Sequence, residues 1–172
     1  MKILFAALSY LLGAFPTGYL LFKWTSRNDI RRFGSGATGA TNVLRLKGWR
    51  LAVPVALIDV AKGVVPALAA FRLSDGDSGF AALCGSLAVL GHCYPVYIGF
   101  RGGKGVATAA GAMFALAPGP AALCLGVFIL IVAATRYVSL GSMGAAVLFP
   151  VFGFLLNRPW PLLLGSLLLV AV

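Results

Sequence analysis

The chain has 172 residues, of which 60% are hydrophobic and only 10% are charged. A soluble domain carries about a quarter charged residues, so this composition excludes the soluble classes and indicates a polytopic membrane protein. The 14 lysines and arginines outnumber four acidic residues, which gives a net charge of +10. Because the basic residues lie between apolar stretches rather than in a solvated arm, they predict no nucleic-acid partner. They are typical of loops that fix membrane topology and of sites for anionic substrates.

Apolar segments of the chain predict its membrane helices. They lie near residues 3–22, 51–71, 79–97, 104–117, 120–135, 138–156 and 160–172. The fourth is short for a span of about 20 residues, and with Pro118 and Pro120 after it we expect a helical hairpin with the fifth. No small-residue cleavage site precedes Lys23, which favours a first membrane helix over a signal peptide. We therefore expect an all-α integral membrane protein with seven transmembrane helices, forming one domain over residues 1–172.

The distribution of basic residues predicts the orientation. If the loop from Lys23 to Arg50 is cytoplasmic, ten basic residues lie on that side and three on the other, the ten being Lys23, Arg27, Arg31, Arg32, Arg45, Lys47, Arg50, Arg101, Lys104 and Arg136, and the three Lys2, Arg72 and Arg158. By the positive-inside rule the N-terminus is then outside and the C-terminus cytoplasmic. Three loops rich in glycine, hydroxyl and basic residues, at 23–50, 97–104 and 135–142, share the cytoplasmic side. We expect the chemistry of the protein there.

The first loop has the pattern Gly-x-Gly-x-x-Gly at residues 34–39, with Asp59 at the distance expected of a ribose-binding acid. A dinucleotide site also needs a preceding strand and a βαβ unit, and a basic linker stands there instead, so nucleotide binding is not predicted. Glycine still lets the backbone approach a ligand closely. Hydrogen-bonding and cationic groups suited to a phosphate accompany it: Ser35, Thr41, Asn42 and Arg45. An ordinary flexible loop with arginines that fix topology is the alternative.

The second loop belongs to the stretch 91–108, which contains His92, the single histidine of the chain. Residues 102–105 read Gly-Gly-Lys-Gly and look like part of a P-loop. However, Ile98 stands where the first glycine belongs and no Ser or Thr follows the lysine, so nucleotide hydrolysis is not supported. A helix beginning near Lys104 would direct free N–H groups and one positive charge at an anion. His92, near the end of the third segment, is either a structural hydrogen-bonding residue or a base.

Weaker signals come from the third loop and the second span. Ser139 and Ser142 either complete a polar site or cap the helix that follows. Asp59 and Lys62 are three residues apart and share one helical face within a span, where ionisable groups pair or face a cavity. The alternatives for them are a structural ion pair and a role in shaping the floor of the site.

The cysteines predict no special chemistry. They are odd in number, lie in apolar surroundings and form no Cys-x-x-Cys pair: Cys84, Cys93 and Cys124. Neither a disulfide framework nor a metal site is supported, and we expect packing residues.

Taken together, these stretches resemble the bacterial acyl-phosphate:glycerol-3-phosphate acyltransferase family. The matching motifs are Gly34-Ser35-Gly36 with Gly39-Ala40-Thr41-Asn42 and Arg45, Asp59-x-x-Lys62-Gly63, Gly91-His92, Gly102-Gly103-Lys104-Gly105-Val106-Ala107-Thr108, and Val138-Ser139-Leu140-x-Ser142. The resemblance implies a seven-helix membrane enzyme with its N-terminus outside. It implies transfer of a fatty acyl group from acyl phosphate to the 1-hydroxyl of glycerol 3-phosphate. The implied products are lysophosphatidic acid and phosphate, in the first step of phospholipid synthesis, without a metal or other cofactor.

The resemblance also implies roles for residues. Ser35, Arg45 and Lys104 occupy functionally required positions, and His92 is the fourth candidate catalytic residue. The candidate substrate-binding and phosphate-binding residues come from the three loops: Gly34, Gly36, Thr41, Asn42, Gly102, Gly103, Gly105, Thr108, Ser139 and Ser142. Because no Ser-His-Asp or Cys-His set is evident, we expect direct acyl transfer by positioning and charge stabilisation, without a covalent acyl-enzyme.

The remaining expectations concern the setting of the enzyme. It should be a multi-pass protein of the bacterial inner membrane, in contact with lipid, that functions as a monomer and contacts the enzyme producing acyl phosphate. Ala37 stands where the family often has Asn, and the chain stops at Val172 before the basic cytoplasmic tail usual in the family. A membrane carrier for organic phosphate is the runner-up function, favoured if Asp59 faces a water path open to both sides. A non-catalytic lipid-binding protein is the third.

Overall fold

The computed structural model describes residues 1–158. Within them the chain forms eight α-helices and two short 3-10 helices and no strand, which confirms the all-α class. In chain order the elements are α1 (Lys2–Gly13), α2 (Thr17–Ser26), η1 (Ile30–Arg32), α3 (Ala40–Lys47), α4 (Trp49–Leu73), α5 (Ser78–Cys93), η2 (Val96–Ile98), α6 (Val106–Leu116), α7 (Pro118–Thr135) and α8 (Val138–Leu155).

Five helical stretches are long and apolar enough to cross a membrane: α1 with α2, α4, α5 with η2, α7 and α8. The apolar helix α6 has only 11 residues. Pro118 opens α7 directly after Ala117, where its missing N–H needs no partner, so α6 and α7 form the expected hairpin. The seventh predicted segment, 160–172, lies outside the described residues. The count of seven spans and the side of the C-terminus therefore stay predictions.

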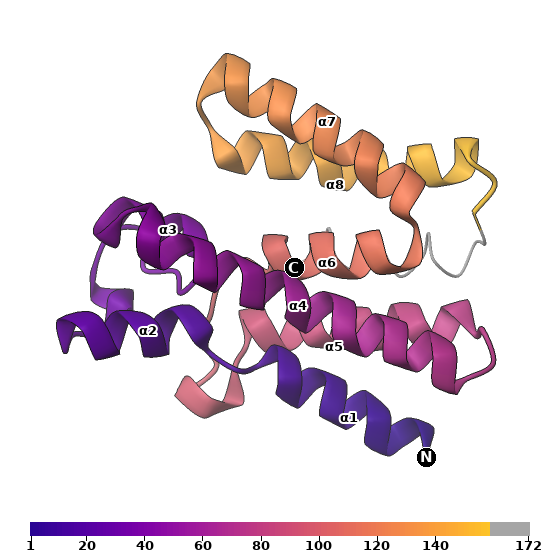
Figure 1. Ribbon diagram of the computed structural model, residues 1–172, viewed down its shortest axis with the longest axis horizontal. Helices are drawn as coiled ribbons and strands as arrows, with labels where there is room; N and C mark the ends of the chain where they lie inside the picture. Colours follow the sequence, from indigo (N-terminus) through magenta and orange to yellow (C-terminus); the bar gives the residue numbers. More distant parts are fainter. Residues whose placement is uncertain (159–172) are drawn as a thin grey trace.

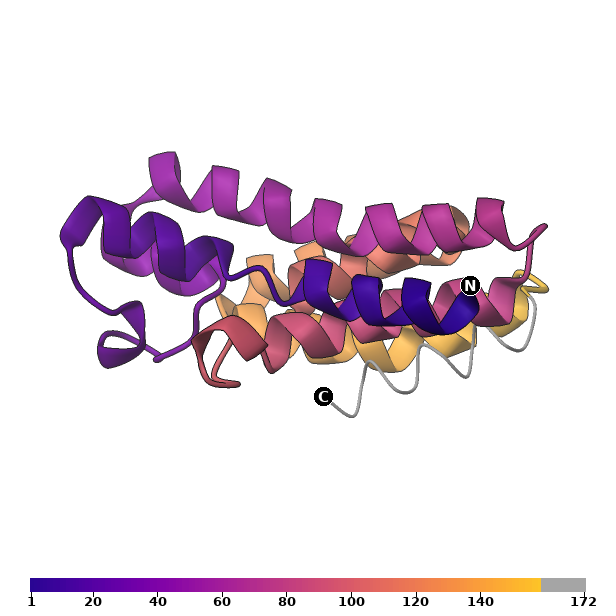
Figure 2. The same ribbon diagram turned by 90° about the horizontal axis from the view of Figure 1, so that it is seen from below.

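The connections between helices fall at two opposite ends of the bundle (Figure 1). The N-terminus, the α4–α5 turn and the α6–α7 turn lie at one end, and α2, α3 and the α7–α8 turn lie at the other. Figure 2 shows the same division from below, with α1 and α2 pointing to opposite ends. We call the end that holds residues 27–48, 94–105 and 136–137 the loop end. The three glycine-rich and basic loops thus lie together, while the side of the membrane they face stays a prediction.

The first span is divided, so the prediction of one helix over 3–22 is wrong. α1 ends at Gly13 and α2 begins at Thr17, with Pro16 between them. Proline has no N–H, and its ring clashes with the carbonyl four residues earlier, which favours a break at this position. α4 continues through Pro54 and Pro66, so proline alone does not force one. The Phe15 carbonyl at the break accepts hydrogen bonds from Thr17 N (3.0 Å) and from Lys62 Nζ (2.7 Å) on α4. A charged side chain of a neighbouring helix therefore satisfies the backbone group that the break leaves exposed.

Glycines let two pairs of helices approach until their backbones touch. A Cβ at Gly13 on α1 would overlap the backbone of Ala88 on α5. A Cβ at Gly63 on α4 would overlap the Thr108 carbonyl on α6. Small residues at helix contacts are typical of membrane proteins, where packing rather than the hydrophobic effect holds helices together. The second contact fixes α6, and with it the glycine loop before α6, against α4.

Candidate active site

Asn42 organises the backbone of the first loop. This residue of α3 is only 2% exposed. Its Nδ2 donates to the carbonyls of Phe33 (3.1 Å) and Ala37 (2.9 Å), and its Oδ1 accepts from the N–H of Ser35 (3.1 Å). Gly34 has a positive φ of 60°, and a side chain there would overlap Asn42 Oδ1. Because its amide is engaged with the loop, Asn42 shapes the site from within, and its role in binding substrate stays a prediction.

The other side chains that the sequence singled out in this loop, unlike Asn42, are exposed to solvent. Ser35, Thr41 and Arg45 are exposed at the loop end. Among the described residues Arg45 makes no ion pair, and neither hydroxyl has a hydrogen-bond partner. Ser35 in the loop and Thr41 and Arg45 on α3 thus present two hydroxyl groups and a guanidinium that are free to bind a phosphate.

The second loop folds back onto the end of α5 through backbone hydrogen bonds. Gly102 N donates to Cys93 O and Gly103 N donates to His92 O, both at 3.1 Å. Gly105 precedes α6 with a φ of 70°, and a Cβ there would lie 2.8 Å from Val89 Cγ1. The helix starts at Val106, close to the predicted start, so Lys104 lies at its positive end with its side chain exposed.

Direct contacts join the three loops. Thr38 N in the first loop donates to Gly102 O in the second at 3.3 Å. Lys104 Nζ in the second loop lies 3.5 Å from Ser139 Oγ at the start of α8. These contacts confirm that segments distant in the sequence form one surface, and Arg45 and Lys104 lie on segments that border it.

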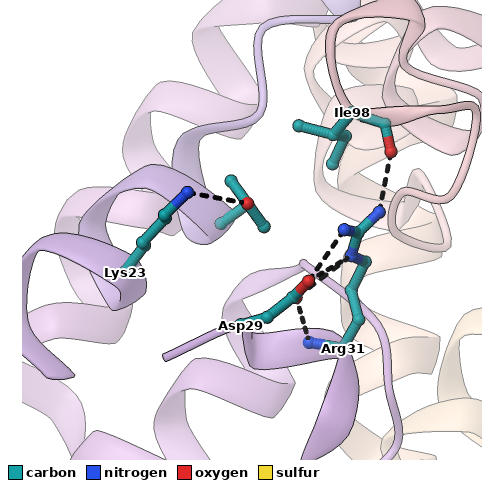
Figure 3. Close-up of polar contacts among 5 residues, drawn as sticks. Lys23, Asp29, Arg31 and Ile98 are labelled. Carbon is teal, nitrogen blue, oxygen red and sulfur yellow. Dashed lines mark hydrogen bonds and ion pairs between the residues drawn. The ribbon is translucent and has the colours of Figure 1, made fainter. Parts of the chain in front are cut away.

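A further link between the first two loops involves Asp29 and Arg31 (Figure 3). Arg31 Nη2 lies 2.8 Å from Asp29 Oδ2, and Arg31 Nη1 donates to the Ile98 carbonyl of η2 at 2.7 Å. The hydrogen bond from the Arg31 side chain lowers the pKa of Asp29 below its ordinary value. The carboxylate thereby orients the guanidinium, and the guanidinium holds η1 against η2.

A buried polar cluster lies beneath the second loop, formed by Asp59, Lys62, His92 and the Phe15 carbonyl. Lys62 Nζ is 2.6 Å from Asp59 Oδ1, which places the charges in direct contact and confirms the predicted shared face. His92 Nδ1 lies 3.5 Å from Lys62 Nζ and 3.6 Å from Asp59 Oδ1. The three side chains are 1%, 4% and 7% exposed, in chain order. The ion pair is therefore enclosed within the protein.

Three other predicted residues have local roles in this structure. Thr108 is fully buried on α6, and its Oγ1 has no hydrogen-bond partner among the described residues. Ser142 Oγ donates to the Ser139 carbonyl one turn earlier in α8, at 2.9 Å. Binding of substrate by Thr108, Ser139 and Ser142 stays a prediction, as do the roles of Gly36 and of the other loop glycines.

Sequence reasoning misses the residues that connect the loops. It counts Arg31 only as a topological charge and does not single out Thr38. For Arg31 the sequence does contain a signal, the Asp29-x-Arg31 spacing, in which an N-cap acid precedes a basic side chain by two residues. Residues 1–158 contain no group of three His, Cys, Asp or Glu side chains placed to hold a metal ion.

Comparison with known proteins gives concordant matches. A family model described as glycerol-3-phosphate acyltransferase matches residues 3–172. The glycerol-3-phosphate acyltransferase of Geobacter sulfurreducens is 45% identical over 171 residues, covering 99% of this chain and 87% of the relative. That of Shouchella clausii is 51% identical over 144 residues, covering 83% and 70%. The crystal structure of PlsY (YgiH), an integral membrane glycerol 3-phosphate acyltransferase, in its glycerol 3-phosphate form has a TM-score of 0.94 at 39% identity, covering 99% of this chain and 84% of that one.

Proposed function

The chain belongs to the glycerol-3-phosphate acyltransferase family and is a multi-pass membrane protein, and we propose that it transfers a fatty acyl group from acyl phosphate to the 1-hydroxyl of glycerol 3-phosphate. The products are lysophosphatidic acid and inorganic phosphate, in the first step of phospholipid synthesis. The acceptor and the product are supported by the similarity to PlsY, whose two structures are of a glycerol 3-phosphate form and a lysophosphatidic acid form. The donor is supported by the motifs of the three loops.

The observation that carries the proposal is that two of the unpaired cations at the loop end, Arg45 and Lys104, are the ones on the family motifs. Arg45 and Lys104 are exposed and make no ion pair within residues 1–158. They lie on segments that the bond between Thr38 and Gly102 joins. Both substrates carry a phosphate, so the site needs two groups of anion-binding donors and a rigid backbone between them. Charge-assisted hydrogen bonds from arginine and lysine, together with backbone N–H groups at a helix start, supply such donors.

The reaction needs positioning and charge stabilisation rather than a protein nucleophile. The 1-hydroxyl oxygen attacks the acyl carbonyl carbon, the bond from that carbon to the phosphate oxygen breaks, and phosphate leaves with the electron pair. A phosphate oxygen takes the hydroxyl proton. Lys104 stabilises the charge on the leaving phosphate, Arg45 orients glycerol 3-phosphate through a two-pronged contact, and Ser35 donates a hydrogen bond.

An enzyme is favoured over a carrier by the state of the intramembrane charges. Asp59 and Lys62 are 1% and 4% exposed and are paired with each other, so they line no open water path. The three loops rich in glycine, hydroxyl and basic residues lie together at the loop end. That end carries most of the basic residues, which supports a cytoplasmic site in the bacterial inner membrane with the N-terminus outside.

The decisive test is phosphate release from palmitoyl phosphate by the purified protein in bicelles. We expect release that depends on glycerol 3-phosphate. Arg45→Ala and Lys104→Ala should each lower kcat/KM by about 10- to 150-fold, because each removes a charge-assisted hydrogen bond of about 1.5–3 kcal/mol. Cys124→Ala, a change in the apolar contact between α7 and α8, is the control and should leave the rate unchanged. No release by the unmodified protein, with transport of organic phosphate in liposomes, would overturn the proposal.

Direct transfer has its own test. Rapid quenching during turnover, followed by peptide mass spectrometry, should find no acyl group on Ser35. An acyl-Ser35 species that forms and decays at the rate of turnover would replace direct transfer by a two-step mechanism.

A further inference from the structure

His92 is wedged between the buried ion pair and the glycine loop. On one side its Nδ1 lies 3.5 Å from Lys62 Nζ and 3.6 Å from Asp59 Oδ1. On the other side a Cβ added at Gly103 would overlap His92 Nε2 and lie 3.0 Å from its Cδ2. The ring therefore fills the space between the Asp59–Lys62 ion pair and the backbone of the glycine loop 102–105.

The groups that His92 contacts on the side of the ion pair are fixed in place. Lys62 cannot move away from His92 without losing both Asp59 at 2.6 Å and the Phe15 carbonyl at 2.7 Å. Separating a buried ion pair leaves an uncompensated charge, which is among the most destabilising changes in a folded protein. The break in the first span thus helps to fix the position of Lys62, because the Phe15 carbonyl is available to Lys62 only where the helix is interrupted.

The outer side transmits the position of the ring to the site. Gly103 N donates to the His92 carbonyl, and Gly102 O accepts from Thr38 N in the first loop. Lys104 follows Gly103 directly. A change in the space that the ring occupies therefore moves the loop that carries Lys104 and, through Thr38, the loop that carries Ser35.

We propose that His92 is a positioning residue, a spacer whose size sets how closely the glycine loop 102–105 approaches α4 and α5 and thereby sets its affinity for phosphate. This inference rests on the proposed function. Nδ1 is engaged with the ion pair and Nε2 faces a backbone, so the ring does not act as a base on the substrate. A spacer holds the phosphate alike in the bound substrate and in the transition state, so its loss raises KM more than it lowers kcat.

The test is a double-mutant cycle between positions 92 and 103, measured with palmitoyl phosphate and glycerol 3-phosphate. Gly103→Ala should lower kcat/KM by about 100-fold, the effect of a displacement of about 1 Å in an active site, mainly through KM. His92→Ala should raise KM roughly tenfold, comparable to one lost hydrogen bond. In the double variant the methyl group added at position 103 occupies space that the ring has vacated, so the double variant should be more active than Gly103→Ala alone. Gly126→Ala, on α7 with nothing within 4 Å of an added Cβ, is the matched control.

The outcomes separate the two proposals. Absence of phosphate release by the unmodified protein rejects the function, and the cycle is then read from midpoints of thermal unfolding, where the same rescue is expected. If the unmodified protein releases phosphate and the effects of His92→Ala and Gly103→Ala on kcat/KM simply multiply in the double variant, the proposal that His92 is a spacer is rejected. Loss of kcat at unchanged KM in His92→Ala, with no rescue by Gly103→Ala, shows a proton-transfer role instead. If His92→Ala does not fold, His92→Asn paired with Gly103→Ala takes its place, with the same rescue expected.

Discussion

A methyl group at Gly63 should separate α4 from α6. In Gly63→Ala the new Cβ would overlap the Thr108 carbonyl and lie 2.8 Å from Ala112 N, where ordinary contacts begin at 3.4 Å. Both neighbours are backbone atoms, which cannot rotate away, so the helices must move apart. Overpacking of this kind costs about 1–3 kcal/mol, and the better helix propensity of alanine returns about 1 kcal/mol. We expect a net loss of up to about 2 kcal/mol, or up to roughly 8 °C in Tm for a chain of this length.

The assay uses the three cysteines as reporters. Cys84, Cys93 and Cys124 are free and buried, so a thiol-reactive fluorophore labels them only as the protein unfolds. Gly126→Ala provides the matched control, because it adds the same methyl group to a helix with open space around it. It should raise Tm by roughly 2–4 °C through helix propensity alone. A Tm in Gly63→Ala as high as that of Gly126→Ala would refute the close backbone contact between α4 and α6.

Two further predictions concern charged pairs and use the same unfolding assay. Lys62→Met should destabilise the protein by about 3–5 kcal/mol because it leaves the buried carboxylate of Asp59 without its partner. Adding Asp59→Leu should recover most of that loss. Additive losses would show that the two side chains do not act as a pair. The second concerns pH. Because Arg31 lowers the pKa of Asp29 in the folded protein, the pair stabilises the loop above the ordinary pKa of 3.8 and loses this effect as pH falls through the lower folded value. Asp29→Asn should therefore lower Tm at neutral pH, and its Tm should converge with that of the unmodified protein once the pH falls below the lowered pKa of Asp29; a difference in Tm that persists in acid would contradict this.

Local patterns predicted what depends on neighbours in sequence. The three-residue spacing of Asp59 and Lys62 placed them on one helical face, and the prolines after Leu116 placed the turn into α7. Charge asymmetry placed the three loops at one end, as the contacts of Thr38 with Gly102 and of Lys104 with Ser139 confirm. Each of these follows from helical periodicity or from the cost of placing charge in a membrane.

Features that depend on which helices meet could not be read in advance. Nothing local to His92 indicates that the end of α5 packs beside Lys62, which lies 30 positions earlier. Pro16 was visible, but proline is tolerated inside membrane helices when neighbours satisfy the freed groups, so apolar residues on both sides predicted continuity. Asn42 is a candidate for binding because its amide could bond either a substrate or its own loop, and the sequence does not indicate the bonds to the loop that the structure shows.

The two glycines at 102 and 103 in the second loop are held by main-chain groups. Their bonds run between the backbone atoms of Gly102, Gly103, His92, Cys93 and Thr38. Main-chain bonds do not depend on side-chain identity, so what these positions require is chiefly small size and a given backbone path. Grafting Ser35, Arg45 and Lys104 onto another helical scaffold would therefore not reproduce the site. A designer would have to transplant the interrupted first span, the end of α5 and both loops as one unit.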